Sequence, residues 1–226
     1  MEQITNFGDR RQLAFCVYCG GTTETREHIP SRVFLDEPYP ENLPTIMVCE
    51  KCNHGYSFDE EYVACLIECA RVGGVEKSIL ERKKIKIILA QRPKLLARLK
   101  AMITSSTNTA LFSIEANRIE RVLAKLVRGH MLFDQNEPWP DSSIELKYGG
   151  MEMFNDASRR YFESIPMINF LPEVGSRAMQ RMLVTADVAG TPWIEVQSNR
   201  YRYLSSASGI VRIVLSEYVW CEALLS

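Results

Sequence analysis

The chain has almost no net charge, few histidines and no long hydrophobic run. Its 226 residues contain 27 Lys and Arg against 28 Asp and Glu, and the formal net charge of −1 gives no whole-chain sign of a nucleic-acid or membrane partner. The apolar runs are far shorter than the roughly 18 residues that a transmembrane helix needs. Residues 1–15 also lack the apolar segment of a secretory signal. We therefore expect a globular, cytoplasmic protein.

The number of cysteines does not fit a disulfide framework, because seven is odd and a reducing compartment keeps thiols free or metal-bound. Four of them form two C-x2-C pairs, Cys16 with Cys19 and Cys49 with Cys52, separated by 29 residues. Two such pairs can direct four thiolates at one ion, which predicts a structural Zn²⁺. The alternative is four buried thiols without a ligand. The other three cysteines are expected in the core: Cys65, Cys69 and Cys221.

The segment between the pairs, and the residue just after them, carry polar groups suited to a second metal. Glu27 and His28 are adjacent at the end of an expected short strand, so their side chains leave on opposite faces and one can bind a metal while the other acts as a base. Asn53 directly follows the second pair, where a helix is expected to start. Its amide oxygen could bind the same cation as Glu27, or it could only cap the helix. Oxygen ligands favour Mg²⁺ or Mn²⁺ over zinc.

These pieces resemble, in order and spacing, the HNH endonucleases of the zinc-stabilised ββα-metal class. The resemblance runs from about residue 16 to residue 62 and rests on Glu27-His28, on Asn42-Leu43 before a second strand, and on Cys-x-x-Cys-Asn opening a helix. It implies that His28 is the general base for phosphodiester hydrolysis and that Glu27 and Asn53 hold the catalytic cation. It also implies that Asn42 orients His28, although Asn42 could equally be a turn residue.

Two positions depart from the family pattern. Many relatives have Asp where this chain has Glu27, whose longer side chain reaches differently. Some relatives place a second ligating His at the position of Ser57, which could hold a metal-bound water or contribute nothing. His54 is out of phase by one residue; it could be a site residue, and otherwise it is a solvated side chain at the start of the helix.

The charge is unevenly distributed along the chain. Residues 16–61 hold 3 basic and 9 acidic residues, whereas residues 82–128 hold 12 basic and 2 acidic ones. Arg118, Arg121, Lys125 and Arg128 recur every three or four residues on an expected helix. Such a surface suits a phosphate backbone, and the alternative is a helix face that docks on the acidic segment or on another acidic protein.

The sequence predicts an α+β fold in three regions. Residues 1–72 would form the HNH module, residues 73–135 a basic helical region, and residues 136–226 an α+β region. In the last region, runs of alternating or β-branched residues predict five strands: Ser143–Tyr148, Met182–Ala186, Trp193–Gln197, Tyr201–Leu204 and Ile210–Trp220. Its aromatic residues read as core rather than as a base-stacking platform.

The leading hypothesis is a metal-dependent endonuclease that cuts DNA, the substrate of most of the family, with a homodimer or a partner protein as further possibilities. Restriction and phage defence are compatible roles, and no residue selects between them. The competing hypothesis is a non-catalytic zinc module that binds nucleic acid or a protein.

Overall fold

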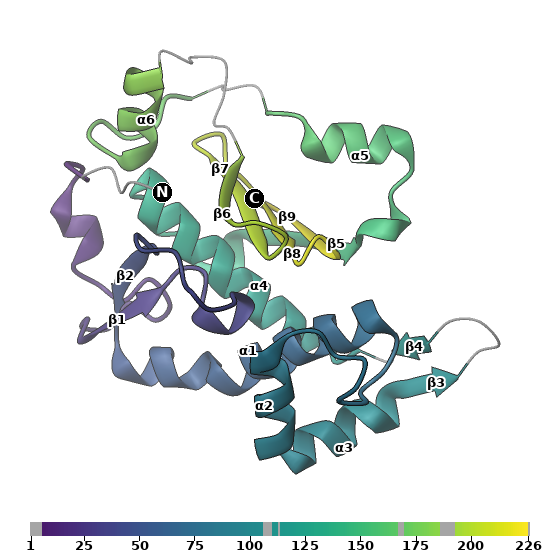
Figure 1. Ribbon diagram of the computed structural model, residues 1–226. Coiled ribbons are helices and arrows are strands. Elements are labelled where there is room, and N and C mark those ends of the chain that lie inside the picture. Colours follow the sequence, from purple (N-terminus) through teal and green to yellow (C-terminus); the bar gives the residue numbers. More distant parts are fainter. Residues whose placement is uncertain (1–5, 106–109, 113, 167–169, 186–192, 226) are drawn as a thin grey trace. The chain divides into compact units, whose positions relative to one another are not determined.

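The computed structural model describes residues 6–105, 110–112, 114–166, 170–185 and 193–225 (Figure 1). The chain forms two compact units, Met1–Gly55 with Leu123–Ser226, and Tyr56–Val122. These units cut across the three regions expected from the sequence, which remain a prediction. The fold is mixed α and β, and every strand pairing in the described residues is antiparallel.

The α-helices of the described residues are α1 (Glu50–Val72), α2 (Lys83–Gln91), α3 (Pro93–Met102), α4 (Ala116–His130), α5 (Asp156–Glu163) and α6 (Arg177–Thr185). The strands are β1 (Thr25–His28), β2 (Thr45–Val48), β3 (Ile103–Ser105), β4 (Ala110–Phe112), β5 (Ile144–Gly150), β6 (Ile194–Gln197), β7 (Tyr201–Ser206), β8 (Ile210–Leu215) and β9 (Val219–Leu225). A π-helical turn, Met131–Gln135, extends α4. Among the described residues, none of these helices combines the length and the apolar character needed to cross a membrane.

The larger unit begins with two short strands and the start of a helix. β1 and β2 pair so that Thr25 lies opposite Val48 and His28 lies opposite Thr45. Cys49 follows β2 directly, and α1 begins at the next residue. The order strand, strand, helix therefore agrees with the order that the sequence predicts for the N-terminal module.

The larger unit also contains a five-stranded sheet in the order β5-β9-β8-β7-β6. Strand alternation gives it two different faces. On one face Met151, Phe162 and Val214 form a buried cluster, against which Trp193 and Trp220 pack. These aromatic residues belong to the core, as the sequence predicts, whereas Tyr161, which the same prediction placed in the core, is 59% exposed.

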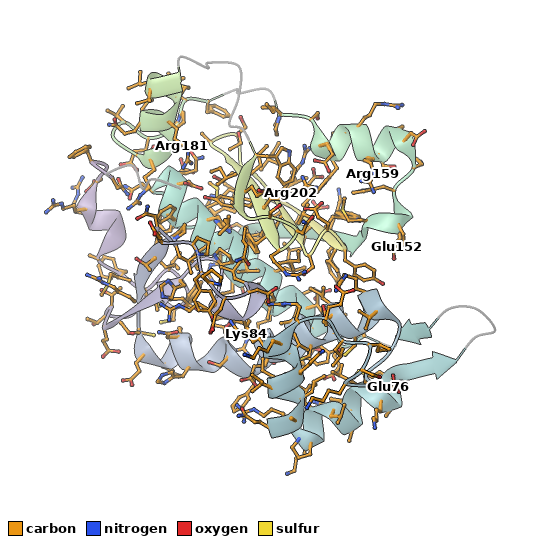
Figure 2. All side chains as sticks on the ribbon, in the orientation of Figure 1. Glu76, Lys84, Glu152, Arg159, Arg181 and Arg202 are labelled. Atoms are coloured by element: carbon orange, nitrogen blue, oxygen red, sulfur yellow. The ribbon has the colours of Figure 1, made fainter. Side chains whose placement is uncertain are left out.

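Buried and half-buried arginines on the same face tie the sheet to α5. Arg212 is almost fully buried, pairs with Glu222 at 2.7 Å, and donates to the carbonyl oxygens of Phe162 and Ser164 at the end of α5. Arg202, labelled in Figure 2, donates to Glu163 of α5 at 2.8 Å. Because the last carbonyls of a helix lack partners within it, Arg212 supplies the donors that α5 needs at its end.

The opposite face of the sheet packs on the C-terminal end of α4. His130 is fully buried, shares a hydrogen bond of 2.8 Å with the Tyr201 hydroxyl, and stacks on Tyr203 with ring centroids 3.6 Å apart. Burial lowers the pKa of His130 to about 3, so this imidazole is neutral in the folded protein. Beyond it, the buried Asp134 pairs with Arg181 of α6 at 2.6 Å.

The smaller unit consists of the rest of α1, α2, α3, the β3–β4 hairpin and the start of α4. Pro93 is the first residue of α3, where its missing N–H costs no helical hydrogen bond. Asp59 of α1 accepts from both Arg118 and Arg121 of α4 at 2.6 Å. Arg92 pairs with Glu61 at 3.1 Å.

One of the strands predicted for the C-terminal region is wrong. Residues Met182–Thr185 belong to helix α6, and residue 186 lies outside the described residues. Ser176 precedes this helix and caps it, because its hydroxyl oxygen accepts a hydrogen bond from the Met179 amide at 3.2 Å. The run Met-Leu-Val-Thr has β-propensity, but the cap and the contact of Arg181 with Asp134 outweigh it. The other four strand-like runs all contain strands, and the last one divides into β8 and β9.

Gly129 provides a test of packing in α4. A helix normally gains about 0.5–1 kcal/mol when an interior Gly becomes Ala. Here, however, a Cβ atom at this position would lie 2.5 Å from Cδ1 of the buried Ile29. We predict that Gly129→Ala lowers the free energy of unfolding by about 1–3 kcal/mol, measured by urea denaturation.

The matched variant is Gly129→Ala combined with Ile29→Val, which removes the nearest clashing atom, Cδ1, and leaves Cγ1 at 2.9 Å from the added Cβ. The double variant should regain part of the loss. A single variant as stable as the parent protein would contradict the close approach of α4 to Ile29.

Candidate metal centre and catalytic residues

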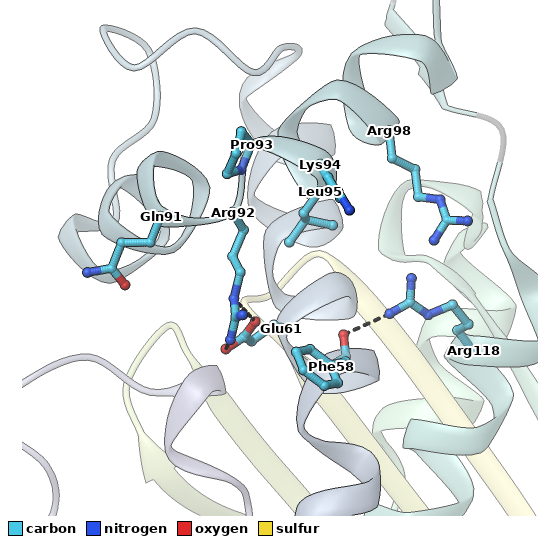
Figure 3. Close-up of a pocket in the computed structure, with 9 residues that line it drawn as sticks. All are labelled: Phe58, Glu61, Gln91, Arg92, Pro93, Lys94, Leu95, Arg98 and Arg118. Carbon is cyan, nitrogen blue, oxygen red and sulfur yellow. Dashed lines mark hydrogen bonds and ion pairs between the residues drawn. The ribbon is translucent and has the colours of Figure 1, made fainter.

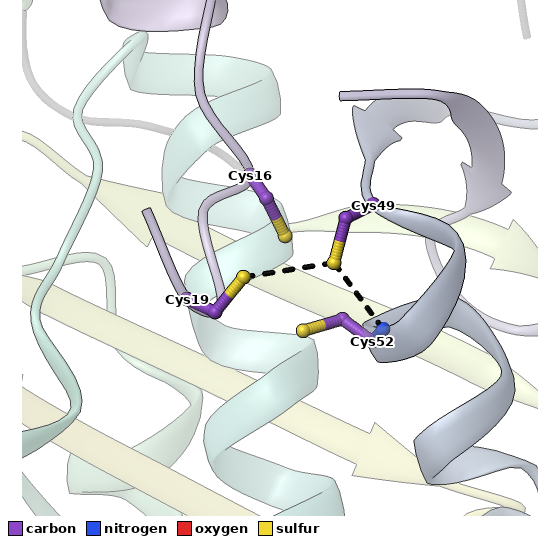
Figure 4. Close-up of side chains that lie close together, drawn as sticks. All are labelled: Cys16, Cys19, Cys49 and Cys52. Atoms are coloured by element: carbon purple, nitrogen blue, oxygen red, sulfur yellow. Dashed lines mark hydrogen bonds between the residues drawn. The ribbon is translucent and has the colours of Figure 1, made fainter. Parts of the chain in front are cut away.

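The four cysteines of the two C-x2-C pairs meet at one point. The Sγ atoms of Cys16, Cys19, Cys49 and Cys52 all lie within 4.8 Å of one another, and those of Cys19 and Cys49 are 3.6 Å apart (Figure 4). A tetrahedral zinc site with Zn–S bonds of about 2.3 Å places its sulfurs about 3.8 Å apart. The arrangement therefore fits one four-coordinate metal ion, as the sequence predicts.

Local backbone geometry explains how each pair of thiols is aimed. After the first pair, the Gly20 amide donates to the Cys16 carbonyl at 2.7 Å, and Gly20 has a φ of +75°, which only glycine adopts readily. In the second pair, the Cys52 amide donates to Cys49 Sγ at 3.3 Å. A tight turn and a helix start thus present two thiols each.

The electrostatics of the cluster also favour a bound cation. Burial, followed by hydrogen bonds with Cys49 and Cys19, raises the pKa of the Cys52 thiol well above its usual range. Four thiolates at these distances repel one another, and a bound divalent cation removes that cost. The remaining cysteines, Cys65, Cys69 and Cys221, are buried away from the cluster, which confirms their expected core positions.

His28 lies at the end of β1 and is half-buried. Its Nδ1 atom is buried and has no hydrogen-bond partner among the described residues. Burial, and then the nearby charge of Arg32, lower the pKa of His28. The imidazole is therefore neutral at neutral pH, the form that can accept a proton.

Glu27, the neighbour of His28, points into the protein. Its side chain is 5% exposed and forms an ion pair with Lys125 of α4, whose own side chain is fully buried. The Lys125 ammonium also donates to the Ser31 hydroxyl at 3.0 Å. Glu27 and His28 thus occupy opposite faces of β1, as alternation predicts, and a protein cation already touches the Glu27 carboxylate.

Asn53 lies in the first turn of α1, because that helix begins at Glu50. It is therefore not the N-cap residue. Its amide nitrogen donates to the Thr25 hydroxyl at 3.3 Å and is 3.4 Å from the Arg26 carbonyl. Thr25 and Glu27 share one face of β1, so Asn53 packs on the face that carries Glu27.

The remaining candidates are exposed. Asn42 is exposed in the turn before β2, and it does not bond to Nδ1 of His28. His54 and Ser57 are both exposed on α1. Glu27 and His28 thus lie on β1, and Asn53 of α1 bonds to that strand. The orienting role expected for Asn42 remains a prediction.

Of the regularly spaced basic residues of α4, Arg118, Lys125 and Arg128 are mostly buried and Arg121 is half-exposed, and the expected contact with a phosphate backbone remains a prediction. Arg118 and Arg121 pair with Asp59, and Lys125 is buried against Glu27. Arg128 is buried as well and donates to the carbonyl oxygens of Val17, Tyr18 and Trp139. The alternative of a helix docked on the acidic N-terminal segment describes Lys125, since its partner Glu27 belongs to that segment.

Lys125 and Ser31 are the residues of this site that the sequence did not reveal. The spacing of basic residues identifies a helix face, but it does not tell whether that face meets water or a buried carboxylate. No local signal distinguishes Lys125 from Arg121, one helical turn earlier and half-exposed.

Comparison with protein-family models, with curated proteins and with solved structures found no match. The function must therefore be inferred from the geometry and chemistry of these residues.

The four-cysteine cluster generates a prediction about zinc and stability. Cys49→Ser should lose the tightly bound zinc and melt far below the parent protein, because a structural zinc contributes on the order of 10 kcal/mol of folding free energy. Elemental analysis after dialysis and a thermal melt measure both effects.

The control is Cys221→Ala, which removes a buried thiol outside the cluster. It should retain about one zinc per chain. A Cys49→Ser protein with normal zinc content and normal melting would contradict the metal site.

Proposed function

We propose that the chain is a zinc-stabilised HNH endonuclease that hydrolyses phosphodiester bonds in DNA. The observation that carries the proposal is the position of His28. It ends the first strand of a strand-strand-helix module whose helix begins at a four-cysteine cluster, and its half-buried imidazole is held neutral. The choice of DNA rests on the family resemblance.

In this proposal His28 takes a proton from the water that attacks the phosphorus atom. Because its pKa is lowered by burial and by Arg32, His28 is in the basic form at neutral pH. The four cysteines hold the ends of the module in place and take no part in the chemistry.

The proposed catalytic cation would be held by Glu27 and Asn53. Among the described residues, the cysteine cluster is the one place where three or more His, Cys, Asp or Glu ligands gather. Glu27 and Asn53 supply two oxygen ligands at most, which fits Mg²⁺ or Mn²⁺, since these ions keep several waters and bind substrate phosphates. When bound, such an ion stabilises the charge that develops on the phosphate.

A second candidate function is a non-catalytic zinc module that binds nucleic acid or a protein. The observation in its favour is the ion pair of Glu27 with the buried Lys125, which gives the carboxylate a purely structural partner. Asn53 likewise has a structural role, because its amide bonds to β1.

Two histidines on the same module discriminate between these functions. His28→Ala should lower the rate of plasmid cleavage in Mg²⁺ or Mn²⁺ by about 100-fold or more, the usual effect of losing a general base. His54→Ala removes an exposed histidine of α1 and should leave the rate unchanged. Equal cleavage by His28→Ala and the parent protein would exclude His28 as the base.

Lys125 tests whether Glu27 can hold the cation. Lys125→Met leaves a buried carboxylate without its ammonium, and this should cost about 3–5 kcal/mol of unfolding free energy. If Glu27 is a ligand, Mn²⁺ should then raise the melting temperature of Lys125→Met more than that of the parent protein.

The double variant Glu27→Gln, Lys125→Met is the control, because it removes both charges. It should recover stability and lose the response to Mn²⁺. An equal Mn²⁺ response in all three proteins would show that the cation binds elsewhere.

A further inference from the structure

A cavity of about 740 Å³ lies within the smaller unit, beside Phe58 of α1 (Figure 3). Its other walls are the junction between α2 and α3 and the first turns of α3 and α4. This volume is within the usual range for small-molecule sites. No part of it uses the cysteine cluster or His28.

The charge of the cavity is mainly positive. Four basic residues line it, Arg92, Lys94, Arg98 and Arg118, and Glu61 is the one acidic residue in the lining. Figure 3 shows these basic side chains directed toward the space near Phe58.

These basic residues differ in how firmly they are engaged. Arg118 is mostly buried and bound to Asp59 at 2.6 Å, so it has a structural role. Arg98 is about half-exposed and 3.3 Å from Glu115. Lys94 is exposed and makes no ion pair with any residue that the structure describes. Exposed pairs such as Arg98 with Glu115 are weak, so these cations can turn to an anionic ligand at little cost.

The position of Lys94 is itself unfavourable without an anion. It is the second residue of α3, and the first turn of that helix contains no acidic residue. A cation there opposes the helix dipole, whose amino end is positive. A bound phosphate would be attracted by both the lysine and the dipole.

The second feature of the cavity is an exposed aromatic platform. Phe58 is 64% exposed, although it is a large apolar residue on a helix. The guanidinium of Arg92 lies 5.1 Å from the centre of its ring, and the Phe58 carbonyl accepts a hydrogen bond of 2.8 Å from Arg118. Phe58 is thus fixed at its backbone while its ring stays accessible beside cations.

We propose that this cavity binds an unpaired nucleotide, with its base stacked on Phe58 and its phosphate held by Lys94, Arg92 and Arg98. Aromatic stacking beside a basic groove is how proteins hold single-stranded nucleic acid irrespective of its sequence. An acidic peptide would use the cations but would gain nothing from the ring. The site goes beyond the proposed hydrolysis and does not require His28 to be a base. The same chemistry serves a free nucleotide or an unpaired base in a strand.

The test measures equilibrium binding to the full chain carrying His28→Ala, so that no substrate is cut. The probes are AMP, a short single-stranded thymidine oligonucleotide, the matching duplex, inorganic phosphate and polyglutamate. Phe58→Leu and Lys94→Ala should each weaken binding of the nucleotide probe by about tenfold. Tight AMP binding identifies a free nucleotide as the source, whereas binding of the oligonucleotide alone identifies a strand.

Two control variants test whether binding depends on this cavity rather than on the overall charge of the protein or on the exact shape of the ring. Lys100→Ala removes an exposed lysine of α3 outside the cavity and should leave binding unchanged. Phe58→Trp keeps an aromatic face and should retain affinity.

Three results would overturn the proposal: no binding of AMP or of the oligonucleotide, binding insensitive to Phe58→Leu, or equal competition by polyglutamate or phosphate. Failure of nucleotide binding leaves the cleavage comparison of His28→Ala with His54→Ala intact, so the two proposals fail independently.

Discussion

The buried polar contacts of the last two turns of α4 are the constraint on which the larger unit depends. Lys125 holds Glu27 of β1, Arg128 holds backbone carbonyls beside the first cysteine pair, and His130 packs on the five-stranded sheet. Gly129 lies between them and lets the helix approach Ile29 closely. One short stretch of helix therefore contacts β1, the turn that carries the first cysteine pair, and the five-stranded sheet.

Burying two cations in such a stretch is costly unless each finds partners. Lys125 and Arg128 have different kinds of partner. Lys125 meets a carboxylate and a hydroxyl, so its charge is neutralised. Arg128 donates to the carbonyl oxygens of Val17, Tyr18 and Trp139, and its guanidinium also lies 3.8 Å from the Asp141 carboxylate.

The sequence predicts best those features that neighbouring residues determine. The spacing within each cysteine pair sets the thiol positions locally, and alternation in β1 sets Glu27 against His28, so both could be read in advance. The environment of the basic face of α4 could not be predicted. Whether Lys125 contacts water or Glu27 depends on packing between segments about a hundred residues apart.

The pairing of Glu27 with Lys125 also bears on how a cation would bind under the proposed function. Carboxylate and ammonium together are neutral, so a divalent ion added at Glu27 would leave two positive charges uncompensated in a largely buried place. A phosphate group supplies the missing negative charge. The ion and the DNA backbone are therefore expected to bind together, because each lowers the electrostatic cost of the other. Lys125 would then keep the site closed to a divalent cation until a substrate phosphate is present.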